Sequence, residues 1–427
     1  MNRRYERTAH SGSDFLGVIP DHWKVCRGAA FLYEKKTRNF GTASDNYLSL
    51  MANRGIILYS EKGDVGNKKP EDLSKCKVVE RGDFVINSMN YAIGSYGVSP
   101  YDGICSPVYL IMGNNPRNSD HAFVNYILSN KHYQTYAQSF GTGILDHRRA
   151  IGWDEIKTIP VALPPVAEQT AIARFLDHQT GRIDGLIEKK TRFIALLNQK
   201  EKSAISRLVR NGANRDATLV DSGVEWRGTV PAHWRRGRLK DHFRQEKRQG
   251  YEILTVLSVY REFGVIEKSS RDDNINKTPE DLSKYQLVNP NDLVINKMKA
   301  WQGSMGVAGM RGITSPDYVV MRPVGEHDPR YMHHYLRAQP MPWVYRLISN
   351  GIRTDQWRME PEKFLGLPVF MPPMDEQRRI ADQIDIQLER IRGLIAKTER
   401  SIDLLREKRA ALITAAVTGK IDVRTAA

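Results

Sequence analysis

The sequence has few cysteines and no long apolar run. Its three cysteines, Cys26, Cys76 and Cys105, form neither a CxxC pair nor a zinc-ligand spacing, which favours a reducing compartment. No apolar stretch approaches the length needed to span a bilayer, and the opening MNRRYERTAHSGSDF lacks the apolar core of a signal peptide. We therefore expect a cytoplasmic protein without a membrane segment.

Sequence motifs for catalysis are absent as well. A P-loop needs GxxxxGK[ST], and the Gly419-Lys420 pair lacks the upstream glycine. An adenine methyltransferase needs an Asn/Asp-Pro-Pro-aromatic turn, whereas the two Pro-Pro pairs read LPPV at 163–166 and MPPM at 371–374. No Gly-rich strand-to-helix turn offers a cofactor site. We expect no catalytic residue, no bound cofactor and no metal, and hence a chain that is not itself an enzyme.

Positive charge is abundant. The 427 residues include 64 Lys+Arg against 49 Asp+Glu, which gives a net charge of +15 and a pI near 9.6. Such an excess favours a polyanionic partner, and nucleic acid is the leading candidate over a membrane surface. The length exceeds what one hydrophobic core organises, so we expect two to three domains.

The chain contains an internal repeat with a period close to half its length. Five segments recur in the same order in the second half. They are FLGVIPDHW (15–23) and WRGTVPAHW (226–234), PEDLSK (70–75 and 279–284), GDFVINSM (82–89) and NDLVINKM (291–298), GICSPVY (103–109) and GITSPDY (312–318), and LPPVAEQ (163–169) and MPPMDEQ (371–377). Five collinear matches establish a duplication.

Each copy combines a globular part with a long helix. Short β-type runs separated by turn signals, with a helical stretch at 121–139, predict α+β domains with a mixed or antiparallel sheet. The predicted parts are a globular domain at 1–162, a helix at 163–212, a second globular domain at 213–370, a helix at 371–420 and a frayed tail at 421–427. The fold class is therefore two similar domains joined by two long helices.

The two predicted helices carry a narrow apolar stripe that recurs every seven residues. Such a stripe favours an intramolecular coiled coil between the two copies, and the alternative is that each helix packs on its own domain. The predicted seam residues are Leu176, Ile183, Leu186, Leu197, Ile384, Ile391, Leu394, Leu405 and Leu412. Polar seam positions either set the register or contact bound subunits, and the sequence leaves that choice open.

The segments between the repeated motifs diverge, so one scaffold carries two different sets of loops. Cations in these loops can contact phosphates, while Asn, Gln and Arg can read base edges. The candidate DNA-binding residues are Asn87, Ser88, Asn90, Tyr91, Arg148, Arg149, Lys297, Lys299, Trp301, Gln302, Arg353, Gln356 and Arg358. For any single residue, an ordinary solvated basic loop is the alternative.

The strings DSGVEWRGTVPAHW, DLVINKM, SPxY and LPPxxEQxxIxxFLD resemble the motifs of specificity subunits of type I restriction–modification systems. The resemblance covers essentially the whole chain, although the first copy, SGSDFLGVIPDHW, lacks the Val-Glu-Trp of the second. It implies that 1–162 and 213–370 are target recognition domains, and that the two long helices pair antiparallel as a spacer. An unread gap set by these helices and an asymmetric, bipartite site in double-stranded DNA would follow.

The same resemblance implies enzymatic partners. Two modification subunits would bind S-adenosylmethionine and methylate a flipped adenine, and restriction subunits would use ATP and Mg. This chain itself would bind none of these cofactors. A free-standing sequence-specific or architectural DNA-binding protein is the alternative, and a single-chain modification enzyme is disfavoured by the missing methyltransferase turn.

Overall fold

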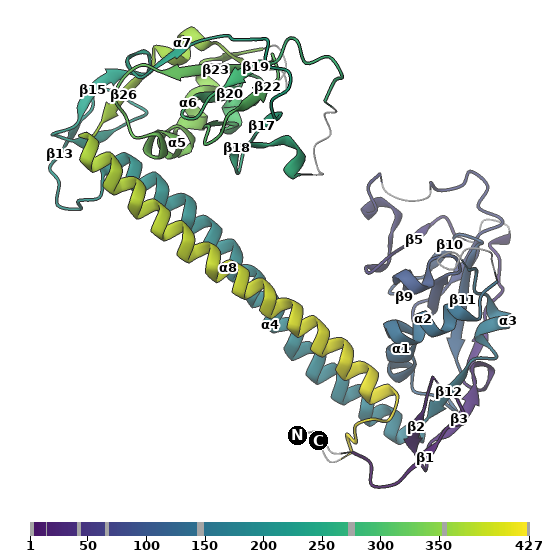
Figure 1. Ribbon diagram of the computed structural model, residues 1–427. Coiled ribbons are helices and arrows are strands. Elements are labelled where there is room, and N and C mark those ends of the chain that lie inside the picture. The colour runs from purple at the N-terminus through teal and green to yellow at the C-terminus, as the bar shows by residue number, and fades with distance from the viewer. Residues whose placement is uncertain are drawn as a thin grey trace. The chain divides into compact units, whose positions relative to one another are not determined.

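The computed structural model describes residues 4–13, 15–40, 44–64, 68–142, 149–271, 278–351 and 357–424 (Figure 1). It divides into two compact units. The first unit contains residues 1–190 and 400–427, and the second contains residues 191–399. Each of the two long helices, α4 (Val166–Asn211) and α8 (Met374–Val417), therefore has residues in both units.

The sequence explains where these helices begin. Pro165 directly precedes the first residue of α4 and Pro373 that of α8, and proline is tolerated at a helix start because the first N–H groups have no intrahelical acceptor. Gly212 follows the last residue of α4 with a φ of +79°, a left-handed conformation that favours glycine and ends the helix.

Parts of α4 and α8 pack together within each unit. In the first unit, Leu176 near the start of α4 shares a core with Ile413 near the end of α8. Farther along, Arg409 Nε lies 2.9 Å from Asp184 Oδ1. In the second unit, Leu208 near the end of α4 shares a core with Ile384 near the start of α8. The two helices therefore run antiparallel, which confirms the predicted pairing of the two copies.

The buried stripe on each helix advances by three and four residues in turn. Leu176, Ile183, Leu197, Ile384 and Ile391 are buried in it, and Leu405 and Leu412 are half-buried. Leu186 and Leu394 are 48% and 39% exposed, so their assignment to the seam is wrong. Each is followed by an isoleucine, and the residue that faces the partner helix lies one position later. The other seam position is thus filled by Thr180, Ile187, Ile194, Leu388, Ile395 and Ile402.

The first globular part is built on a four-stranded antiparallel sheet of order β4-β11-β8-β9. Its strands are β4 (Leu32–Glu34), β11 (Tyr109–Asn114), β8 (Phe84–Asn87) and β9 (Tyr96–Val98). Alternate side chains of β8 face opposite sides. Phe84 and Ile86 pack in the core that contains Phe123 and Val124 of α1 (His121–Ser129), whereas Val85 packs with Leu48 of β5 (Leu48–Met51). The sheet is therefore a middle layer.

The remaining elements of the first unit frame this sheet. Strand β5 forms a hairpin with β6, β7 pairs with β10, and β12 leads directly into α4. Their bounds are β1 (Thr8–His10), β2 (Val18–Pro20), β3 (Lys24–Arg27), β6 (Gly55–Leu58), β7 (Lys77–Val79), β10 (Gly103–Cys105), α2 (Lys131–Ser139), α3 (Trp153–Ile156) and β12 (Pro160–Leu163). The single helix predicted at 121–139 is two helices, because the Asn130 side chain caps α2 by accepting from Tyr133 N at 3.1 Å.

The second unit repeats this architecture around the sheet β16-β23-β20-β21. In β20, Leu293 and Ile295 face the helix core, and Val294 packs with Leu257 of the β17–β18 hairpin. The bounds are β13 (Leu219–Asp221), β14 (Thr229–Pro231), β15 (Arg235–Arg238), β16 (Phe243–Gln245), β17 (Leu257–Tyr260), β18 (Gly264–Glu267), β19 (Gln286–Val288), β20 (Leu293–Asn296), β21 (Met305–Val307), β22 (Gly312–Thr314), β23 (Tyr318–Pro323), α5 (Pro329–Arg337), α6 (Met341–Leu347), β24 (Ser349–Asn350), β25 (Arg358–Met359), α7 (Pro361–Leu365) and β26 (Pro368–Met371). The predicted α+β duplication is confirmed.

The tail that follows α8 is ordered on the first unit as far as residue 424. Val423 is 3% exposed in the core, and Lys420 Nζ donates to Leu16 O at 3.3 Å. The Arg424 guanidinium lies 5.0 Å from the centre of the Tyr5 ring. The expectation of a frayed tail is therefore wrong for 421–424, because an apolar residue at 423 anchors it, and 425–427 lie outside the described residues.

Repeated motifs join the start of each long helix to a turn. In the first unit, Glu168 Oε1 accepts hydrogen bonds from Tyr5 OH at 2.7 Å and Trp23 Nε1 at 3.2 Å, and Glu168 Oε2 lies 2.8 Å from His22 Nε2. In the second unit, Glu376 Oε2 lies 2.7 Å from His233 Nε2. The PxHW turn and the acidic residue after the Pro-Pro pair thus recur because, in each unit, their contact holds the start of the long helix against the turn.

Replacing Glu168 with alanine is expected to lower the free energy of unfolding of the first unit by about 3 kcal/mol, because buried donors would lose a charged acceptor. The carboxylate is 8% exposed, so water replaces it poorly. Native-state hydrogen exchange read by mass spectrometry reports this unit separately. Glu188→Ala, at an exposed position of the same helix, is the matched control. A loss no larger than that of the control would contradict the prediction.

Candidate nucleic-acid interface

Two turns with closely similar backbones follow the central strands β8 and β20. The amide of Asn87 donates to Ser95 O at 3.0 Å, and the amide of Asn296 donates to Ser304 O at the same distance. Each turn contains a short 3₁₀ helix, η4 (Tyr91–Ile93) or η8 (Ala300–Gln302), followed by a glycine with positive φ. The fold therefore presents residues 88–93 and 297–302 in the same conformation with different side chains.

In the first unit, the candidates in this turn differ in their exposure. Asn90 is exposed, and Asn87 Oδ1 accepts from Met89 N at 3.2 Å. Ser88 Oγ donates to Val108 O at 3.2 Å. Tyr91 is fully buried, and its hydroxyl donates to Leu128 O at 2.7 Å. Its assignment as a DNA contact is wrong, because its ring packs in the core that contains Phe84 and Leu128.

In the second unit, the same turn gathers positive charge. Lys299 is exposed, and the amide of Met359 donates to Lys297 O at 3.1 Å, which brings Arg358 of β25 beside the turn. Burial lowers the pKa of Lys297, and the neighbouring Arg358 guanidinium lowers it further. Like charges held together in this way raise the local affinity for an anion such as a phosphate.

Aromatic rings border this basic turn. The Trp301 and Trp357 ring centres are 5.7 Å apart with an edge-to-face geometry, and the Arg346 guanidinium lies 4.6 Å from the Trp357 ring centre. Trp301 Nε1 donates to Met298 O at 3.2 Å, and Gln302 beside it is half-buried. The sequence reasoning missed Trp357 and Arg346, although Trp357 lies in a stretch that diverges between the halves.

The four remaining candidate residues divide into those that the structure describes and those that it does not. Arg149 is half-buried, and its Nη1 donates to Ser139 O at 3.3 Å, so its guanidinium contacts the backbone of its own unit. Arg148, Arg353 and Gln356 lie outside the described residues.

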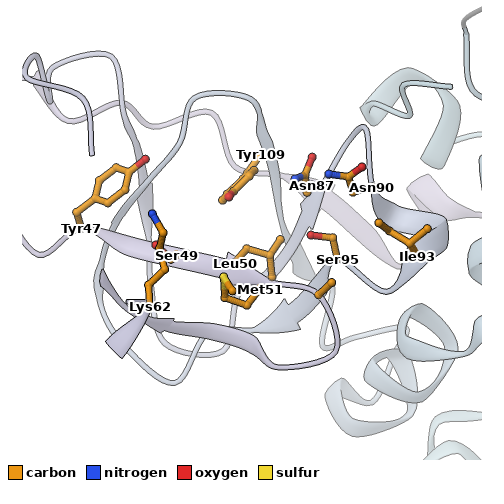
Figure 2. A pocket seen from close by; sticks show the side chains of 11 residues that line it. Tyr47, Ser49, Leu50, Met51, Lys62, Asn87, Asn90, Ile93, Ser95 and Tyr109 are labelled. Carbon is orange, nitrogen blue, oxygen red and sulfur yellow. The ribbon is translucent and has the colours of Figure 1, made fainter. Parts of the chain in front are cut away.

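A cleft of about 170 Å³ lies beside the turn of the first unit (Figure 2). Its walls come from β5, the end of β8, η4 and the start of β11, and the residues that line it are Tyr47, Ser49, Leu50, Met51, Ala52, Lys62, Asn87, Asn90, Ile93, Ser95 and Tyr109. Figure 2 shows Asn87 and Asn90 at one end and Tyr47 and Lys62 at the other. The sequence analysis named Asn87 and Asn90 but missed the hairpin residues, which lie about 40 positions earlier.

The described residues offer little for covalent chemistry. Burial raises the pKa of Cys26 to about 11 and that of Cys105 to about 12, so both thiols keep their protons at neutral pH and are poor nucleophiles. Within the described part of the chain, no three His, Cys, Asp or Glu side chains gather in a way that could hold a metal ion. Across the same residues, no helix is both long and apolar enough to cross a membrane. The turns and the cleft are suited to polar recognition.

Comparison with known proteins finds similarity to a specificity subunit of a type I restriction enzyme. No family model matches it. The candidate type I restriction enzyme MjaX specificity subunit of Methanocaldococcus jannaschii is 27% identical over 207 residues, which are 48% of this chain and 46% of that protein. The chain thus aligns with about half the length of this relative. The resemblance inferred from the motifs is confirmed by this match.

Solved structures share the fold. A chain from a structure entitled "Structural basis underlying complex assembly and conformational transition of the type I R-M system" has a TM-score of 0.65 at 16% identity, covering 94% of this chain and 99% of the other. The HsdS subunit from Thermoanaerobacter tengcongensis has a TM-score of 0.52 at 17% identity, with 94% and 98% covered. Both likenesses extend over nearly the full length.

Proposed function

We propose that this chain is the DNA-recognition subunit of a type I restriction–modification complex and is not itself catalytic. The observation that carries the proposal is the pair of matched turns, because one backbone presents two different sets of side chains. Each unit would read one half of an asymmetric, bipartite site in double-stranded DNA. The two half-sites would differ because the turns carry different residues.

The chemistry of the second turn supports a contact with DNA. Lys297, Lys299 and Arg358 would neutralise phosphates and position the unit on the duplex. Gln302 in the second unit and Asn90 in the first carry amides that can pair with base edges in the major groove. The net charge of +15 provides the long-range attraction.

The long helices would carry out the second part of the function. We propose that 1–162 and 213–370 are the target recognition domains, that 163–212 and 371–420 set the unread gap, and that two modification subunits dock on this chain. Exposed apolar side chains on α4 and α8 support docking, among them Leu186, Phe193 and Leu404, which are 48%, 44% and 57% exposed. S-adenosylmethionine, ATP and Mg would belong to the modification and restriction subunits.

The free thiols Cys26, Cys76 and Cys105 support a cytoplasmic location.

Methylome sequencing of the source cell tests this proposal. Deleting the gene is expected to remove one bipartite adenine-methylation motif, and restoring the gene should bring it back. Exchanging residues 213–370 for another recognition domain should change one half of that motif and leave the other half intact. Persistence of every methylated motif in the deletion strain would contradict the proposal. A purified chain that binds DNA without any co-purifying methyltransferase would favour the free-standing alternative.

A further inference from the structure

The cleft in Figure 2 has counterparts for all of its positions in the second unit, 209 residues later (296 − 87 = 209 for the asparagines that end β8 and β20). Some positions keep their chemistry in both units. These are Ser49/Ser258, Lys62/Arg271, Asn87/Asn296, Ser95/Ser304 and Tyr109/Tyr318. Tyr47 and Leu50, whose counterparts are Val256 and Val259, are buried core positions. Others change, namely Met51/Tyr260, Ala52/Arg261, Asn90/Lys299 and Ile93/Gln302. We call the positions that keep their chemistry the floor and those that change the rim.

The floor residues hold the backbone of the cleft. Asn87 Oδ1 accepts from Met89 N at 3.2 Å, and Asn296 Oδ1 accepts from Met298 N at 3.1 Å. Tyr109 packs with Leu50 of the hairpin in one core, and the matching Tyr318 packs against the core that contains Val259. These contacts join the turn, the sheet and the hairpin, so the fold itself explains why the floor is the same in both units.

The floor also carries a cation. Lys62 is 7% exposed, and its ammonium lies 4.6 Å from the centre of the Tyr59 ring. Its counterpart Arg271 lies 5.4 Å from the Tyr260 ring centre and 4.9 Å from that of Phe263. A positive charge retained at the base of a small polar cleft favours the electronegative atoms of DNA whatever the sequence.

The rim residues are not needed to hold the fold of either unit. Asn90 and Lys299 are exposed at equivalent places on the same turn, and Ile93 is 57% exposed, so its burial contributes little to folding. Because the backbone beneath them is the same, each can change without altering the cleft. The rim therefore differs between the units for a reason other than folding.

We propose that Met51, Asn90 and Ile93 determine the sequence of one half-site, and that Tyr260, Lys299 and Gln302 determine the other. The proposal rests on the proposed function and adds the place where bases are read. An asparagine or glutamine amide matches the N6 and N7 atoms of adenine, whereas a lysine ammonium matches the N7 and O6 atoms of guanine. Apolar Met51 and Ile93 are suited to a thymine methyl group.

The test transfers part of the rim from the second unit to the first. Asn90→Lys and Ile93→Gln are placed together on the chromosomal gene, so that the full chain assembles with its own partners. The variant is expected to fold because the second unit carries these residues on the same turn, and its melting temperature checks this. We expect methylome sequencing to show one half-site changed at one or two positions, with the preference for guanine over adenine at one position raised roughly tenfold or more.

Controls separate the possible outcomes. Met89→Leu alters the same turn outside the cleft lining and should leave the motif unchanged. An unchanged motif in the double variant overturns this inference and leaves the proposed function intact, whereas a motif that survives gene deletion overturns the proposed function. If the double variant folds but methylation is lost, the single variant Asn90→Ala tests the inference instead. A half-site relaxed at one position supports the inference, and an unchanged half-site overturns it.

Discussion

Lengthening α4 and α8 by one heptad each is expected to move methylation to a motif whose unread gap is about three base pairs longer. Seven helical residues add about 10.5 Å at a rise of 1.5 Å per residue, and one base pair occupies about 3.4 Å. Because each helix has residues in both units, the insertion lengthens the connection between them. Copies of residues 184–190 and 393–399, inserted after Lys190 and Glu399, keep the three-four spacing of the buried stripe.

The measurement is again the methylome, which should show both half-sites unchanged and the original motif unmethylated. Insertion of two residues at the same places is the matched control. Two residues rotate the following side chains by about 200° on a helix, so the buried stripe would turn away from the partner helix and methylation should be lost instead of moved. A new half-site sequence with an unchanged gap would refute the role of the helices as a spacer.

Acidification from pH 7 to pH 5 is expected to destabilise the second unit by on the order of 4 kcal/mol. Burial lowers the pKa of His327 to about 4, that of His333 to about 3 and that of His334 to about 4. Arg337 lowers the pKa of His333 further, because its guanidinium lies against the imidazole. These rings are neutral in the folded unit throughout this range.

The loss of stability at low pH follows from proton linkage. An unfolded histidine has a pKa near 6.5, so below that pH the unfolded chain binds protons that the folded unit does not. Stability is therefore fully present above about pH 6.5 and falls as the pH drops toward 4. Hydrogen exchange at a series of pH values measures this slope in each unit. His334→Gln should reduce the slope in the second unit, and His10→Gln, at an exposed position of the first, should not. An equal slope before and after His334→Gln would contradict the prediction.

Local sequence patterns predicted much of the architecture. Short β-type runs between turn signals predicted the strands of α+β domains, and the Pro-Pro pairs marked the starts of both long helices. The HW and EQ motifs recur in both copies, and the structure joins them through Glu168 and Glu376. These features are legible because each depends on residues close together in the chain.

The errors have a shared physical origin. Leu186 and Leu394 were placed in the seam by the seven-residue recurrence, but the isoleucine after each lies there instead. A difference of one residue rotates a side chain by about 100° on a helix. Tyr91 was expected at the surface because it lies in the loop that matches the basic loop of the second half, yet its ring enters the core and its hydroxyl donates to Leu128 O. A local pattern constrains which residues can be buried. The segment that packs against them decides which of two neighbouring residues is buried.

The candidate site also contains residues that the sequence identified and residues that only the structure revealed. The sequence identified Asn87, Asn90, Lys297 and Lys299 because they are polar or basic residues at the end of a predicted strand and in the loop that follows it. It did not identify Met51 or Lys62, since nothing local connects the hairpin that carries them with the turn after β8. The cleft arises when the sheet brings these segments together.

The sequence by itself determined the duplication, the α+β class of each copy and the pairing of the two long helices, because repeats and periodicities are carried by neighbouring residues. Their antiparallel direction was implied by the resemblance of the motifs. Only the tertiary structure decided which side chains face the partner helix, which loop residues reach the surface and which of them share a cleft. Those outcomes depend on packing between segments far apart in the chain, where burial and hydrogen bonding of one residue are settled by another.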